Sequence, residues 1–228
     1  MNALRARLRE TGSEDRGLSM VELLVVLMIT GILMTIIGTL FVNVARVTAN
    51  SNSTTSRSTT AANLMDAVTK VIRTASNNAV ATSEDADPAV VAGTASTLSI
   101  ISYVDASPTI PAPTKVNYRV DGSGNLVEDR YSSTQTAGYW VFGTTAKSRV
   151  FPGPVLTGTG DDALFVYLDS ENHTIIPGTS GLSVTQRALV ASIKVNIRIA
   201  NPLTTGADPI VLVNTVGMPN LNVSRTDN

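Results

Sequence analysis

The side chains that could do chemistry in this chain are few and scattered. His173 is the only histidine and there is no cysteine, so a zinc site with the usual nitrogen and sulfur ligands is not expected. A serine, a histidine and carboxylates occur together over residues 169–173, but a triad within one short turn cannot take the geometry of nucleophilic catalysis. We therefore predict no catalytic residue, no metal and no cofactor, and a protein that is not an enzyme.

Two groups of acidic residues resemble fragments of a cation site. Asp121 opens the sequence DGSGN, which begins like a calcium loop, but the twelfth position of that loop is Ser132, where a glutamate is needed. A hairpin turn is the better interpretation of this stretch. Asp161, Asp162 and Asp169 are the other carboxylates that could touch a cation, but no metal site is predicted there.

The elements around these residues are dominated by an apolar run near the N-terminus. Residues Leu23 to Val42 are twenty consecutive residues without a charge. A helix of that length crosses a hydrocarbon core of about 30 Å. A secretory signal peptide would have a shorter apolar region followed by a small-residue cleavage site, and this run has neither. Glu22 lies at the entrance of the run, where an ionisable group near lipid costs about 1–3 kcal/mol and suggests a partner.

Flanking charge predicts the orientation of this segment. Four arginines precede it, whereas Arg46 follows it alone, so the N-terminus is expected in the cytoplasm and the bulk of the chain outside. The part after Val47 carries 12 Lys and Arg against 14 Asp and Glu, with no basic run. Binding to nucleic acid is therefore not supported by charge.

The stretch GLSMVELLVVL, from Gly17 to Leu27, resembles the processing site of type IV prepilins and type II secretion pseudopilins. That site consists of a glycine, a hydrophobic residue, three further residues, a glutamate and then an unbroken apolar helix. The resemblance implies cleavage between Gly17 and Leu18 by a prepilin peptidase, followed by N-methylation of Leu18. An ordinary signal anchor would explain the apolar run and the arginines, but not Gly17 and Glu22 at this spacing.

The resemblance also implies a role for Glu22. Its carboxylate would pair with the free amine of Leu18 on a neighbouring subunit, compensating two poorly hydrated charges and selecting the register of assembly. The alternative is that Glu22 only reaches toward the headgroups. The expected partners are the prepilin peptidase, other pilins or minor pilins through the N-terminal helix, and the membrane, crossed once.

Further along, apolar residues recur at helical spacing from Ala61 to Ala75, with Asp66 and Lys70 on the other face. We predict one helix from about Leu18 to about Asn77, roughly 90 Å at 1.5 Å per residue. Many major pilins have a proline where this chain has Thr39, so no kink is expected there. The predicted organisation is a cleaved leader over 1–17, the membrane half of the helix over 18–47, its soluble half over 48–80, a loop over 81–96 and an antiparallel β-rich exported domain over 97–228.

The second half of the chain favours strands. The segments expected to form them are 98–104, a hairpin over 115–131, 163–168, an alternating run over 189–199 and its partner 210–216. Tyr139, Trp140 and Phe142 form the only aromatic cluster, interpreted as core or as an interface patch. The predicted fold is α+β, with a long N-terminal helix, its first half membrane-spanning, packed on an antiparallel β-sheet domain as in pilins.

A finer resemblance concerns the order of the later elements. The helix end LMDAVTKVIRTAS, the strand ALFVYLD and two terminal strands joined by a proline-containing loop resemble J-type minor pseudopilins and their minor-pilin relatives. Another minor pilin is the main alternative, since major pilins are usually shorter. The resemblance implies a structural subunit that leaves the inner membrane for an extracellular or periplasmic filament, which it primes or caps. The alternative is a pilus-tip binding module for a surface, DNA or an exported substrate. The sequence leaves open whether the machine is a type IV pilus, a competence pilus or a type II secretion system.

Overall fold

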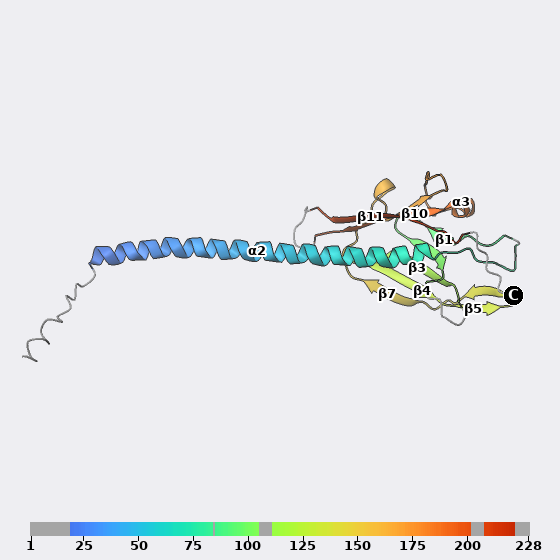
Figure 1. Ribbon diagram of the computed structural model, residues 1–228, viewed down its shortest axis with the longest axis horizontal. Helices are drawn as coiled ribbons and strands as arrows, with labels where there is room; N and C mark the ends of the chain where they lie inside the picture. Colours follow the sequence, from blue (N-terminus) through green and yellow to red (C-terminus); the bar gives the residue numbers. More distant parts are fainter. Residues whose placement is uncertain (1–18, 84, 105–110, 202–207, 222–228) are drawn as a thin grey trace, which may run out of the picture. The chain divides into compact units, whose positions relative to one another are not determined.

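The computed structural model describes residues 19–83, 85–104, 111–201 and 208–221 (Figure 1). These residues form two compact units, which divide after Ser51. The helix α2, Met20–Arg73, contributes its first part to one unit and its second part to the other. Within the first unit the described chain is helical from Met20 to Ser51, without a break at Thr39.

The second unit contains two antiparallel sheets and a separate hairpin. The larger sheet has the strand order β1-β2-β3-β4-β7 and the smaller one β11-β10-β8-β9, while among the described residues β5 and β6 pair only with each other. The strands are β1 (Val90–Gly93), β2 (Leu98–Ser102), β3 (Thr114–Val120), β4 (Leu126–Tyr131), β5 (Ser133–Thr136), β6 (Tyr139–Phe142), β7 (Lys147–Phe151), β8 (Phe165–Leu168), β9 (Thr174–Ile175), β10 (Ser192–Ile199) and β11 (Ile210–Gly217). The 3-10 turn η1 (Gly160–Asp162) and the short helix α3 (Val184–Leu189) complete the described elements.

The core of this unit forms around the second part of α2, which lies between the two sheets in Figure 1. Ala61, Leu64, Val68, Val71 and Ile72 are fully buried, as their helical spacing predicts. Residues from both sheets join them in one apolar cluster, among them Leu98, Ile100, Val116, Phe165, Tyr167, Ile193, Val195 and Ile197. The predicted α+β fold is therefore confirmed, with two sheets in place of one around the helix.

The predicted end of the helix near Asn77 is wrong by four residues. The α-helix ends at Arg73, and the next residues exchange main-chain hydrogen bonds with β2 and the residue after it. The Ser76 N–H donates to the Ile101 carbonyl at 3.1 Å, and the Tyr103 N–H donates to the Thr74 carbonyl at 3.0 Å. The chain leaves the helix here because its main chain finds hydrogen-bond partners at the edge of the sheet. A further helical turn would lose these hydrogen bonds.

Two other boundaries differ from the prediction. The stretch 81–96, expected to be a loop, contains β1, which pairs with β2 through Val90 opposite Ile100. The strand expected over 189–199 begins only at Ser192, because α3 comes directly before it. A capping box starts α3: Ser183 Oγ accepts from the Gln186 N–H, and Gln186 Oε1 accepts from the Ser183 N–H.

The remaining strand predictions agree with the structure. The hairpin expected over 115–131 is formed by β3 and β4, and β11 pairs with β10 along its whole length, from Ile210 opposite Ile199 to Gly217 opposite Ser192. The β5–β6 hairpin was not predicted. Its turn is Ala137-Gly138, both with positive φ, 51° and 86°. A turn of this type favours Asn-Gly, so an alanine gives no signal of it in the sequence.

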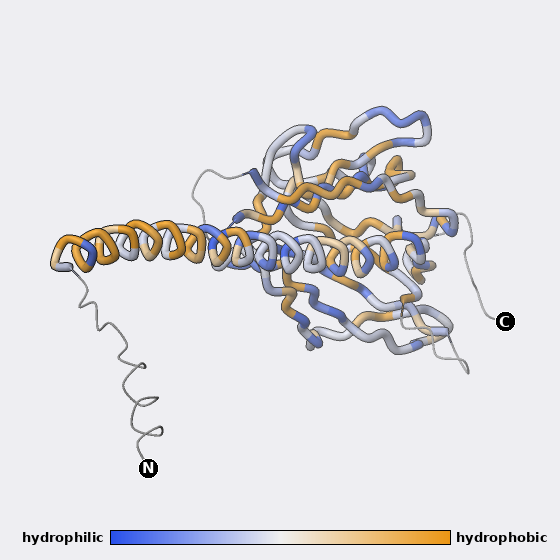
Figure 2. Tube along the Cα trace, turned by 60° about the vertical axis from the view of Figure 1, so that its left-hand side comes forward, coloured by the Kyte–Doolittle hydropathy of each residue, from blue (hydrophilic) through white to orange (hydrophobic). Residues whose placement is uncertain are grey.

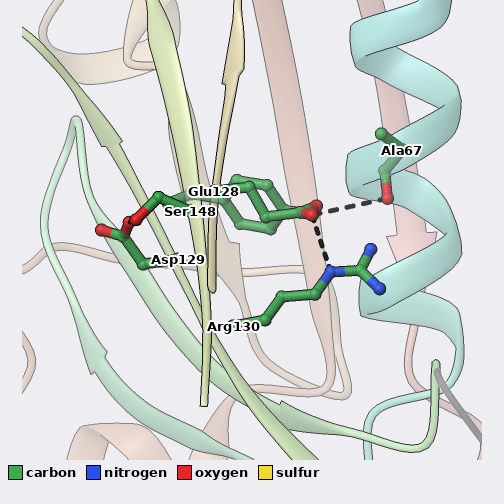
Figure 3. Close-up of polar contacts among 6 residues, drawn as sticks. Ala67, Glu128, Asp129, Arg130 and Ser148 are labelled. Carbon is green, nitrogen blue, oxygen red and sulfur yellow. Dashed lines mark hydrogen bonds and ion pairs between the residues drawn. The ribbon is translucent and has the colours of Figure 1, made fainter. Parts of the chain in front are cut away.

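A buried polar network joins the larger sheet to α2 (Figure 3). Glu128 on β4 is 1% exposed and accepts hydrogen bonds from the Tyr118 hydroxyl at 2.6 Å and from Arg130 Nε at 2.7 Å. The Tyr118 hydroxyl also lies 3.5 Å from the carbonyl oxygen of Ala67 on α2. Burial raises the pKa of Tyr118 well above its ordinary value, and the neighbouring Glu128 carboxylate raises it further. The tyrosine therefore stays neutral and can donate to the carboxylate.

Candidate functional site

The start of α2 is organised by Ser19 and Glu22. The Glu22 N–H donates to Ser19 Oγ at 3.4 Å, and the Leu23 N–H donates to the Ser19 carbonyl at 3.1 Å. Ser19 is thus the N-cap, which satisfies a main-chain donor that a helix start otherwise leaves unpaired. Glu22 lies in the first turn, where the helix dipole favours a negative charge. Sequence reasoning missed the cap, although the spacing S-x-x-E is its recognised signal.

The carboxylate of Glu22 is available for an external partner. Glu22 is exposed, and no side-chain partner is recorded for it among the residues that the structure describes. It is also the sole ionisable residue in the sequence from Met20 to Ala45. A single carboxylate at the end of a long apolar segment can form one strong pair with a cation, provided that the cation comes from outside this helix.

The surface that follows Glu22 is apolar on every side of the helix, and Figure 2 shows it as a continuous hydrophobic segment. The large apolar side chains of this run are all exposed, from 45% at Val42 to 74% at Phe41. A helix that is apolar all round needs lipid or other helices around it. Of the described residues, those of α2 form the one helix that is long and apolar enough to cross a membrane.

Two of the three threonine hydroxyls inside this segment are satisfied within the helix. The Thr35 hydroxyl donates to the Gly31 carbonyl at 2.9 Å, and the Thr39 hydroxyl donates to the Ile36 carbonyl at 2.8 Å. Such bonds allow threonine to lie in lipid without an unpaired donor. Glu22 therefore remains the distinctive polar group of the segment. Gly17 and Leu18, the predicted processing residues, lie outside the described residues.

The other residues singled out from the sequence form local turns. Asp169 Oδ1 accepts from the N–H groups of Glu171 and His173, at 2.9 and 2.8 Å, and these bonds lower the pKa of Asp169, the bond from His173 most. His173 Nδ1 lies 3.5 Å from both Asp169 Oδ2 and Glu171 Oε2 on an exposed surface. This arrangement is a carboxylate-capped turn, which orients no nucleophile toward the histidine.

The candidate cation ligands have partners of their own. Asp121 closes the β3–β4 turn by accepting from the N–H groups of Ser123 and Asn125, at 2.8 and 2.9 Å. Asp161 lies 3.9 Å from Lys194 Nζ, and Asp162 lies 3.5 Å from Arg198 Nη1. Among the described residues, no three His, Cys, Asp or Glu side chains are grouped so as to hold a metal ion.

The N-terminal segment matches a motif of a known family. Residues 13–38 match the prokaryotic N-terminal methylation motif. The match spans the predicted cleavage position, Glu22 and most of the apolar run. No curated protein and no solved structure matches the chain.

The motif and the helix together indicate the class of this protein. The N-terminal methylation motif indicates a type IV pilin-like or pseudopilin-like precursor, and the apolar helix of the described residues is consistent with an anchor in the inner membrane. Proteins with this motif are structural, and the motif implies processing by a prepilin peptidase and assembly with other pilins through the membrane helix.

Proposed function

We propose that this chain is a minor pilin or pseudopilin, which after cleavage between Gly17 and Leu18 primes or caps a type IV pilus-like filament. The observation that carries the proposal is the carboxylate of Glu22 within the methylation motif, the sole ionisable group from Met20 to Ala45, at the head of an exposed apolar helix. In the membrane this carboxylate pairs with the methylated amine of Leu18 on a neighbouring subunit. The pair forms because both charges are poorly hydrated when unpaired.

The proposed position of the subunit in the filament rests on the order of elements in the β domain. The order of the helix end, β8 and the terminal pair β10–β11 supports a place among J-type minor pseudopilins and related minor pilins. The N-terminus lies in the cytoplasm and the β domain outside, as the arginines before the apolar run favour. A subunit that begins a filament is needed once per filament, so its copy number is far below that of the major subunit.

Filaments sheared from the native host, with and without this gene, test the proposal. If the chain primes assembly, its deletion reduces the number of filaments per cell while the length of those that remain is unchanged. Immunoblots of the sheared fraction then show the chain well below the major subunit in amount. A deletion strain with a normal number of filaments, or a chain as abundant as the major subunit, contradicts the proposal.

A further inference from the structure

A groove runs beside the β5–β6 hairpin, within the second unit. Its volume is about 440 Å³. The groove is lined by Val91 and Ile101, by Trp140, Val141 and Phe142 on β6, and by Val184 on α3. Val141 is 52% exposed and Val184 is 69% exposed. Partly exposed aromatic side chains, next to the exposed Val141 and Val184 and the buried Ile101, have the composition of the centre of a protein interface.

The main chain of β6, whose residues line this groove, has unpaired groups on the side away from β5. The Gly143 N–H donates to the Ser132 carbonyl at 2.9 Å, and the register pairs Val141 with Thr134 and Trp140 with Gln135. In an antiparallel ladder every second pair exchanges hydrogen bonds, so Val141 and Tyr139 bond to β5. The N–H and C=O groups of Trp140 and Phe142 consequently point away from β5, and no main-chain partner is recorded for them among the described residues.

Arg187 on α3 also lines the groove. It donates through Nη1 to the Val91 carbonyl, which holds the guanidinium in place. Arg187 therefore contributes a fixed positive charge to the lining of the groove.

We infer that this groove binds an extended apolar segment of a partner protein, which adds to β6 as a third strand. Main-chain bonds to Trp140 and Phe142 supply the pairing, while alternate side chains of the segment enter the groove toward Val91 and Ile101. A hairpin of two strands is only marginally stable by itself, so a third strand also stabilises β5 and β6. Asp87, Lys115 and Arg187 give the groove charges of both signs, which suit a polypeptide better than a nucleic acid.

The test uses Trp140, the only tryptophan of the chain, as its reporter. The full-length protein in nanodiscs is titrated with a soluble peptide of alternating threonine and valine flanked by lysines. The matched control peptide has the same sequence with N-methyl groups on alternate amides, which removes the donors needed for strand pairing. We expect a saturable change in Trp140 emission with the first peptide, binding weakened by about tenfold or more in the second, and slower hydrogen exchange of the Trp140 and Phe142 amides.

Two surface variants separate this site from general adhesion. Val184→Asp places a charge on the wall of the groove and is expected to abolish the response. Val211→Asp alters a similarly exposed valine on β11 and is expected to leave the response unchanged. Equal binding of both peptides or unchanged amide exchange would overturn the inference. So would a Trp140 response to the oligosaccharide chitotetraose with none to the peptide, because the groove would then bind a sugar.

Discussion

The hydroxyl of Tyr118 donates a hydrogen bond of 2.6 Å to the carboxylate of Glu128, and both side chains are shielded from water. A carboxylate buried in this way is stable only while its donors remain, because an unpaired charge inside a protein is strongly penalised. The same hydroxyl reaches toward the Ala67 carbonyl on α2. The pair therefore lies where the helix meets the larger sheet and specifies how the two pack (Figure 3).

Replacing Tyr118 with phenylalanine is expected to lower the free energy of unfolding by about 1–3 kcal/mol, because Glu128 then loses a donor while it stays buried. Chemical denaturation of the full chain in detergent, followed by circular dichroism, measures this change. Tyr139→Phe is the matched control, since Tyr139 is partly exposed on β6 and its substitution is expected to be nearly neutral. Equal effects of the two substitutions would contradict a stabilising role for the Tyr118–Glu128 pair.

A substitution in the turn of the β5–β6 hairpin is expected to stabilise the hairpin. Ala137 has a φ of 51°, a conformation in which a side chain other than that of asparagine or aspartate is disfavoured. We predict that Ala137→Asn stabilises the hairpin by about 0.5–1 kcal/mol and slows exchange of its amide protons. Gly138→Ala is expected to act in the opposite direction, since φ there is 86°. The same sign for both substitutions would show that the turn is not of this type.

The β3–β4 turn is expected to weaken in acid. Hydrogen bonds from the side chain and main chain of Asn125, with a further bond from the Ser123 N–H, hold the pKa of Asp121 below its ordinary value of 3.8. The folded pKa is the lower one, so the contribution of this carboxylate is complete above the unfolded value and is lost as the pH falls through the folded value.

The amide proton shifts of Ser123 and Asn125 report this titration by nuclear magnetic resonance. Their common midpoint is expected below 3.8 in the wild type, and the titration is expected to disappear in Asp121→Asn. A midpoint at or above the ordinary value would mean that the carboxylate does not hold the turn.

Glu22→Gln is expected to separate assembly from membrane insertion. The substitution keeps the shape of the side chain but removes the charge proposed to attract the Leu18 amine of a neighbour. We predict that the variant is still inserted and cleaved, while its amount in sheared filaments falls at least about tenfold. Ser19→Ala, which removes only the helix cap, serves as the control and is expected to retain assembly. Normal assembly of Glu22→Gln would contradict the proposed pair.

The sequence predicted those features whose physical signal is periodic. The apolar run, the buried stripe from Ala61 to Ile72 and the alternating strand β10 were found because each repeats with the period of its own element. The helix end and β1 were missed because they depend on tertiary pairing, as in the hydrogen bond from Ser76 to a residue of β2. The β5–β6 hairpin was missed because an alanine does not indicate the positive φ that Ala137 adopts in its turn.

The same difference explains which candidate sites could be found from the sequence. Glu22 was identified because a single acid beside an apolar run is conspicuous in a sequence. The groove beside β6 was not, since Val91, Trp140 and Val184 meet only through the packing of separate elements. Tyr139, Trp140 and Phe142 were expected to be core or an interface patch. They are neither fully buried nor fully exposed, which agrees better with the second interpretation.

The most direct test of the prepilin assignment is the intact mass of the protein after expression with a prepilin peptidase, wild type beside Gly17→Ala. The wild type is expected to lose residues 1–17 and to gain one methyl group on Leu18, whereas the variant keeps its full mass. A wild-type chain that remains uncut in the membrane beside an active peptidase would contradict the assignment as a prepilin, and with it the assembly role of Glu22.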